Sequence, residues 1–189
     1  MRVCIYCGSS PGRDPRFVAS ATALGRALAF AGIGVVYGGG RVGLMGAVAD
    51  AALEAGGQVI GVIPQFLEAR EIAHRDPRVE LRVVTSMHER KAVMAELSDA
   101  FIALPGGFGT FEEFFEIVTW VQLGLTSAPC ILANIDGYYD SLVALLDSAH
   151  DAGFISPANR AIVLTASTVD EVMQRLAVLL FDEARGPRV

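Results

Sequence analysis

Short apolar runs alternate with longer amphipathic stretches along the whole chain. The apolar runs predict buried strands at residues 3–7, 33–37, 59–63, 82–84, 101–104, 130–133 and 161–164. The amphipathic stretches predict helices at about 15–31, 43–55, 86–97, 110–123 and 139–152, with further helix starts at 156–157 and 168–171. This alternation is typical of a parallel sheet covered on both faces. We therefore predict an α/β, three-layer Rossmann-like fold with six to seven parallel strands.

Length and composition indicate one domain. The chain has 189 residues, of which 52% are hydrophobic, so we expect a single domain at residues 1–181 and a frayed tail at 182–189. No apolar run approaches the roughly 18 residues that a membrane helix needs. Gly8 comes too early for a signal peptide, so we expect a cytoplasmic protein without a membrane partner. The net charge of −6 argues against a nucleic-acid partner.

Three cysteines and three histidines give little sign of a metal site. Cys4 and Cys7 form a C-x-x-C pair inside the first predicted strand, where a separation of three turns the side chains to opposite faces. No second cysteine pair or histidine cluster completes a zinc site. We expect buried, inert thiols and no bound metal.

The glycine loop at residues 104–113, LPGGFGTFEE, joins a predicted strand to a predicted helix. Backbone N–H groups at such a helix start point outward and carry partial positive charge. The loop therefore predicts a phosphate cradle at the carboxyl end of a strand, where ligands bind in α/β folds.

A second glycine run begins at Gly38 and matches G-x-G-x-x-G, with its last glycine at Gly43. A dinucleotide site also needs an acidic residue after the next strand, but residues 62–65 read VIPQ, which argues against NAD. Two interpretations stay open. The glycines either permit a tight turn only, or residues 39–46 make a second phosphate or ribose contact, through Gly39, Gly40, Gly43 and Met45.

Arg90 lies on an otherwise apolar helical stripe with Met87, Met94 and Leu97. A buried guanidinium needs an anionic partner, because an unpaired buried charge is very costly. That partner is either a structural ion pair or a bound ligand, and we favour the ligand.

Glu113 follows Thr110 at the spacing of a capping box, so its simplest role is to cap its own helix. It also shares a stripe with Ile117 and Trp120, which places the carboxylate beside an apolar wall. Glu112 and Glu116 flank it, and the pattern alone does not choose among the three carboxylates.

These motifs resemble those of a known family. PGGFGTFEE at 105–113, preceded by MHERK at 87–91, is similar to the signature of the Lonely Guy family, the cytokinin riboside 5′-monophosphate phosphoribohydrolases. The resemblance extends to residues 7–10, 37–40, 43–46, 71–74 and 136–140, and so covers nearly the whole chain.

The resemblance implies hydrolysis of the N-glycosidic bond of an adenosine 5′-monophosphate, often N6-prenylated, to free base and ribose 5-phosphate. It implies Arg90 and Glu113 as catalytic residues, and no cofactor. It implies a homodimer with its active site near the subunit interface. The expected substrate-binding residues are Glu71, Lys91, Gly107, Phe108, Gly109, Thr110, Glu112 and Thr119, in addition to the second glycine run.

Three other functions compete with this one. Similar proteins have been labelled lysine decarboxylases, but that chemistry needs pyridoxal phosphate on a lysine, and Lys91 is the only lysine. A non-catalytic nucleotide or cofactor carrier would use the same loop without needing Glu113. A broad hydrolase of plain AMP would differ only in the pocket for the N6 group.

Overall fold

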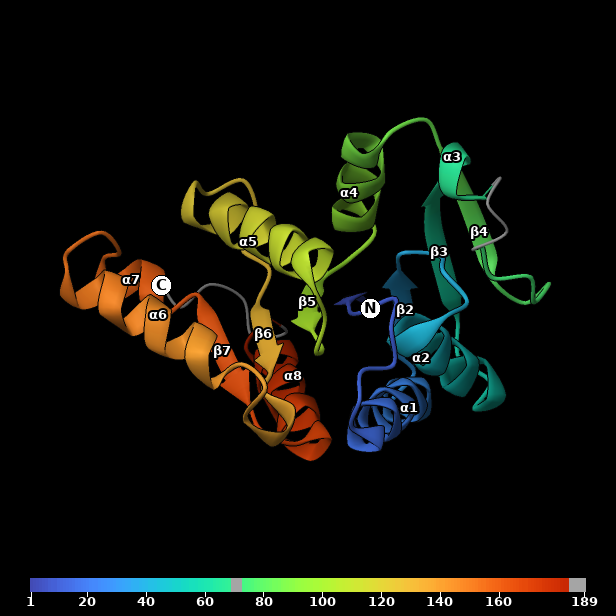
Figure 1. The fold of residues 1–189 in the computed structure, drawn as a ribbon, viewed down its shortest axis with the longest axis horizontal. Coiled ribbons are helices and arrows are strands. Elements are labelled where there is room, and N and C mark those ends of the chain that lie inside the picture. Colours follow the sequence, from blue (N-terminus) through green and yellow to red (C-terminus); the bar gives the residue numbers. More distant parts are fainter. Residues whose placement is uncertain (69–72, 184–189) are drawn as a thin grey trace.

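The computed structural model describes residues 1–68 and 73–183, which form one sheet between two layers of helices (Figure 1). Strands β1 to β7 span Arg2–Tyr6, Gly34–Tyr37, Val59–Pro64, Glu80–Val84, Ala100–Ala103, Cys130–Ala133 and Val163–Ala166. The sheet order is β4-β3-β2-β1-β5-β6-β7, and every neighbouring pair is parallel. The predicted Rossmann-like α/β fold is confirmed.

The helices α1 to α5 span Pro15–Phe30, Gly43–Glu54, Gln65–Glu68, Met87–Glu96 and Phe108–Gln122. The 3₁₀ turn η1 at Ile135–Gly137 precedes α6, α7 and α8 at Asp140–Asp151, Pro157–Arg160 and Val169–Glu183. Helices α1, α2 and α8 cover one face of the sheet, and α4, α5 and α6 cover the other (Figure 1). No helix in the described ranges is both long and apolar enough to cross a membrane.

Several elements differ from the sequence prediction. The last strand lies at Val163–Ala166, two residues later than expected, because α7 and its C-cap occupy the residues before it. The short helix α3 and the turn η1 were not predicted, since four and three residues are too few for a helical period to show. Helix α8 continues to Glu183, beyond the expected domain end at 181, and residues 184–189 lie outside the described part.

The core has two halves, one on each face of the sheet. Along β1, Val3 and Ile5 face the helices α1 and α2, whereas Cys4 and Tyr6 face α4 and α5. Cys7 belongs to the first half, so the prediction that Cys4 and Cys7 point to opposite faces is confirmed. Burial raises the pKa of both thiols above the ordinary value, which keeps them protonated and unreactive.

Gly25 of α1 packs against the backbone of α2. A Cβ at this position would lie 2.2 Å from the carbonyl oxygen of Val48. Backbone atoms cannot move aside as a flexible side chain can, so glycine sets the distance between the two helices.

We expect Gly25→Ala to lower the free energy of unfolding by roughly 1–2 kcal/mol, because overpacking outweighs the gain in helix propensity. Urea unfolding followed by circular dichroism measures this change. Arg26→Ala, at the adjacent exposed position, serves as the control and should leave stability nearly unchanged. Equal stability of the two variants would contradict the proposed close packing.

Candidate active site

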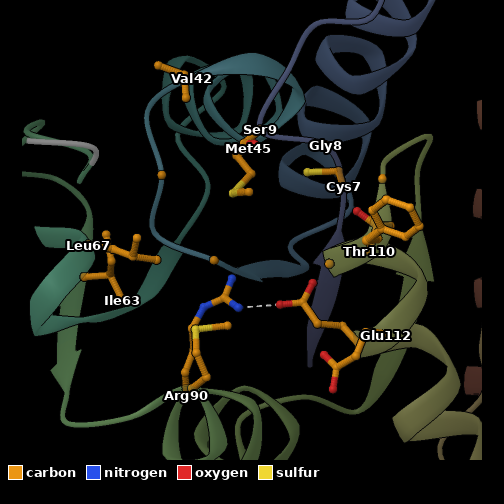
Figure 2. A pocket seen from close by; sticks show the side chains of 17 residues that line it. Cys7, Gly8, Ser9, Val42, Met45, Ile63, Leu67, Arg90, Thr110 and Glu112 are labelled. Carbon is orange, nitrogen blue, oxygen red and sulfur yellow. Dashed lines mark hydrogen bonds and ion pairs between the residues drawn. The ribbon is translucent and has the colours of Figure 1, made fainter. Parts of the chain in front are cut away.

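The main pocket lies at the carboxyl edge of the sheet, where the strand order reverses between β1 and β5. Its volume is about 360 Å³, which suits a small ligand. Segments that follow β1, β2, β3 and β5 contribute to its walls, together with the start of α4. Figure 2 shows Arg90 facing the cavity from one side, Val42 and Met45 from the opposite side, and Thr110 and Glu112 on α5.

Helix α5 presents its first turn to this pocket. Its N-cap is Gly107, which has no capping side chain among the described residues, and Gly107, Phe108, Gly109 and Thr110 all line the cavity. The first-turn N–H groups of a 15-residue helix thus face the pocket without a side-chain acceptor. Phosphate binding by this turn stays a prediction, and the geometry of the helix start is the one that it requires.

The helix begins two residues earlier than predicted. The Phe111 N–H donates to the Gly107 carbonyl at 3.0 Å, so the first helical bond closes on Gly107 rather than on Thr110. Glu113 is therefore in the second turn, and its carboxylate bonds Arg90. The expected capping box of Thr110 and Glu113 is wrong for this reason.

Arg90 and Glu113 form a buried ion pair at the pocket wall, marked by the dashed line in Figure 2. The side chains are only 7% and 9% exposed. Arg90 Nη1 donates to Glu113 Oε1, and Arg90 Nε donates to the carbonyl of Val62 at 3.1 Å. A Cβ on Gly38 would lie 2.1 Å from Arg90 Nη2, so that glycine makes room for the guanidinium. The ion-pair interpretation of Arg90 is confirmed, and the same pair faces the cavity where a ligand would lie.

Two opposing effects act on the Glu113 carboxyl. Burial raises its pKa above the ordinary value, and the positive charge of Arg90 partly offsets that rise. A position in the first turn of a helix would favour the ionised form. Because α5 begins at Phe108, Glu113 lies beyond the first turn, where the dipole is weak, and burial dominates.

Lys91 is occupied by two other carboxylates of α5. Its Nζ donates to Glu112 and, at 3.0 Å, to Glu116. Burial lowers the pKa of Lys91, but the two carboxylates outweigh this effect and the net shift is upward. Lys91 is not among the residues that line the described pocket, whereas Glu112 is. Of the three carboxylates, Glu113 is the one that is buried and paired with Arg90.

The second glycine run divides into two groups. Gly40 and Met45 line the pocket, whereas Gly39 and Gly43 are not among its lining residues. Gly39 and Gly43 have φ angles of 73° and 64°, a left-handed region that favours glycine. A Cβ on Gly43 would also lie 2.4 Å from the backbone of Ser9. For these two glycines the structure supports the turn-forming interpretation.

Two further predicted substrate contacts are not part of the described pocket. Thr119 is exposed on α5, where its hydroxyl donates to the Phe115 carbonyl at 2.7 Å. Glu71 lies outside the described residues.

Some pocket residues were not predicted as binding residues. They lie at or just after the end of a strand, or close to the start of a helix: Cys7, Gly8, Ser9, Gly38, Val42, Ile63, Leu67 and Met87. The rule that ligands lie beyond the carboxyl ends of neighbouring parallel strands could have found those after β1 and β3. The strand order, which the sequence did not reveal, was the missing information.

We expect the Glu113 carboxyl to titrate above the ordinary value of 4.5. Glu112→Gln should lower its pKa by removing a neighbouring negative charge, and Lys91→Met should raise it by removing a positive one. Carbon-13 NMR of glutamate-labelled protein measures the titration, with Glu113→Gln used to assign the resonance. A Glu113 pKa at or below 4.5, or shifts of the opposite sign in the two variants, would contradict this electrostatic account.

Comparisons with a family model and with individual proteins point to the same family. A family model described as possible lysine decarboxylase matches residues 45–176. The chain is 50% identical over 175 residues to a probable cytokinin riboside 5′-monophosphate phosphoribohydrolase of Oryza sativa subsp. japonica, covering 93% of this chain and 71% of that protein. It is 49% identical over 168 residues to a cytokinin riboside 5′-monophosphate phosphoribohydrolase of Rhodococcoides fascians, covering 89% of this chain and 85% of that protein.

Among solved structures, the molybdenum cofactor binding protein of Rippkaea orientalis superposes with a TM-score of 0.69 at 22% identity, covering 95% of this chain and 96% of that one. At that identity the likeness shows a shared fold. The sequence relationships are far stronger, and they show that the chain belongs to the Lonely Guy family of cytokinin riboside 5′-monophosphate phosphoribohydrolases.

Proposed function

We propose that this protein hydrolyses the N-glycosidic bond of N6-substituted adenosine 5′-monophosphates, giving the free base and ribose 5-phosphate. The observation that carries the proposal is the buried Arg90–Glu113 pair, which faces a pocket also lined by the first turn of α5. The names of relatives about half identical to the chain support the same reaction.

In this proposal the first turn of α5 holds the 5′-phosphate. Its N–H groups and the hydroxyl of the buried Thr110 supply hydrogen-bond donors, and Gly107 and Gly109 let the backbone approach the phosphate closely. Gly40 and Met45 form the wall contributed by the second glycine run. Binding the phosphate away from the reacting bond fixes the sugar relative to Glu113 and supplies part of the rate acceleration.

Glu113 and Arg90 carry the chemistry. As the C1′–N bond breaks, its electron pair moves onto the base and positive charge develops on the ribose. An ionised Glu113 stabilises that charge and orients the water that attacks C1′. Arg90 remains charged and is a poor proton donor, so it acts electrostatically on the phosphate or on the departing base. The reaction requires no cofactor in this scheme.

The decarboxylase description of the matching family model fits this chain poorly. A lysine that forms a Schiff base must first lose its proton. Lys91, the only lysine, is held as an ammonium between two carboxylates, which raise its pKa. We propose instead that Lys91 serves the site indirectly, by holding Glu112 at the pocket wall.

The test is to incubate the protein with AMP and with N6-isopentenyl-AMP and to quantify free base and ribose 5-phosphate. We expect Glu113→Gln and Arg90→Ala each to lower kcat by about 10³-fold or more, with the circular dichroism spectrum unchanged. Glu116→Gln is the control. It removes one carboxylate charge from α5 at a residue that does not line the described pocket, so this variant should retain most of the activity.

Each failure of this test has a distinct meaning. Normal turnover in Glu113→Gln or Arg90→Ala would remove that residue from the catalytic role. Binding of AMP without release of adenine from either substrate would contradict hydrolysis and favour the nucleotide carrier instead.

We also propose a cytoplasmic homodimer that pairs through α5 and the residues after it. Leu123 and Leu125, just after α5, are 65% and 69% exposed, and Thr119 is exposed on α5 itself. In such a dimer Thr119 would be placed to contact the substrate near the interface, as the family resemblance implies. The cysteines are free thiols, which suits a reducing compartment.

We expect Leu123→Glu to convert a dimer to a monomer in size-exclusion chromatography with light scattering, because a buried apolar contact would become charged. Phe30→Glu, an equally exposed apolar position on the opposite face of the sheet, should leave the oligomer unchanged. A wild-type monomer, or a dimer that Leu123→Glu leaves intact, would contradict the proposed interface.

A further inference from the structure

Three successive carbonyl groups in the loop between β5 and α5 accept hydrogen bonds from other parts of the chain. The donors are the Tyr139 hydroxyl to Leu104 at 2.7 Å, the Gly8 N–H to Pro105 at 3.0 Å, and the Tyr138 hydroxyl to Gly106. Two adjacent tyrosines of one turn thus bind the loop that leads into the first turn of α5. The motif DGYYD at 136–140 was part of the family resemblance, but neither the catalytic pair nor the phosphate cradle uses it.

The two tyrosines that bind this loop are not among the residues that line the main pocket. Pro105, Gly106 and Tyr138 line a neighbouring cavity of about 310 Å³, and Gly107 lines both cavities. A carbonyl oxygen only accepts hydrogen bonds, so each tyrosine hydroxyl must be the donor. The tyrosines therefore favour the loop conformation in which the carbonyls of Leu104 and Gly106 are directed at these two hydroxyls, outside the main pocket lining.

We propose that Tyr138 and Tyr139 are positioning residues that preorganise the α5 loop for the 5′-phosphate. This inference rests on the proposed function only in naming the phosphate as the ligand. Gly106 and Gly107 are adjacent, and glycines allow the peptide between them to rotate easily. A carbonyl turned toward the pocket would repel the phosphate, and the hydrogen bond from Tyr138 to Gly106 opposes that rotation.

The turn that carries the tyrosines is itself held firmly. Asn134 accepts from the Tyr139 N–H at 2.6 Å and donates to Asp140 at 2.7 Å. Asp136 and Gly137 both have positive φ angles, of 51° and 72°, which bend the chain sharply before the tyrosines.

Aromatic contacts fix both rings. The ring of Phe17 on α1 packs edge-on against the ring of Tyr138, with 5.6 Å between the ring centroids. The ring of Phe111 on α5 packs edge-on against that of Tyr139, with 6.3 Å between the centroids. The two tyrosine rings also contact each other at 4.9 Å. Because the rings are held independently of their hydroxyls, a phenylalanine at either position should keep the packing and lose only the hydrogen bond to the loop.

The decisive variant is Tyr138→Phe. We expect the KM for the nucleotide and the Kd for inorganic phosphate to rise roughly fivefold, which corresponds to one ordinary hydrogen bond. The value of kcat should stay within about twofold, because Glu113 and Arg90 are untouched. The full-length protein is used, with steady-state kinetics for KM and kcat and calorimetry for Kd.

Tyr37→Phe is the matched control. Its buried hydroxyl has no hydrogen-bond partner among the described residues, so its removal should change neither affinity nor rate. Tyr139→Phe should weaken phosphate binding as Tyr138→Phe does. It should also lower the Tm, since the buried carbonyl of Leu104 would lose the hydroxyl that bonds it.

Unchanged phosphate affinity in Tyr138→Phe would overturn the proposal. A fall in kcat at constant KM would also overturn it, because the hydroxyl would then act on the chemical step. A protein that binds phosphate in a Tyr138-dependent manner but releases no base from any nucleotide would support the positioning role and refute the proposed hydrolysis. The two proposals can therefore fail separately.

Discussion

The site depends on one buried ion pair, between Arg90 of α4 and Glu113 of α5. Neither charge would be stable alone at such low exposure, so each helix needs the other in its observed position. The guanidinium also bonds the end of β3 and lies against Gly38 after β2, which ties the pair to the sheet. The same contacts that make the pair tolerable in the fold place a carboxylate and a fixed positive charge at the pocket wall.

Around that pair the backbone supplies most of the remaining polar groups. The first turn of α5 offers N–H groups without side-chain caps, and the loop before it accepts hydrogen bonds from the hydroxyls of Tyr138 and Tyr139. Lys91 and its two carboxylate partners form a second group of charges beside the Arg90–Glu113 pair. In the proposed mechanism the oriented backbone holds the phosphate and Glu113 acts at the sugar, while Arg90 acts on the phosphate or on the departing base.

The sequence predicted the fold class and the centre of the site well, because those features follow from local patterns. The spacing of apolar residues in strands and helices predicted the three-layer architecture. The apolar stripe of α4 predicted that Arg90 is buried. What it missed depended on contacts between distant segments. The earlier start of α5 moved Glu113 out of the first turn, and the pairing of Lys91 with Glu112 removed it from the pocket lining. Neither the glycines that only shape turns nor the wall residues after β1 and β3 could be identified without the strand order.

The most direct measurement is a crystal structure of the Glu113→Gln protein with N6-isopentenyl-AMP bound. The account predicts the phosphate on the N–H groups of residues 107–110 and C1′ of the ribose beside the side chain at position 113. A nucleotide bound elsewhere, or one whose phosphate leaves the first turn of α5 unoccupied, would contradict it.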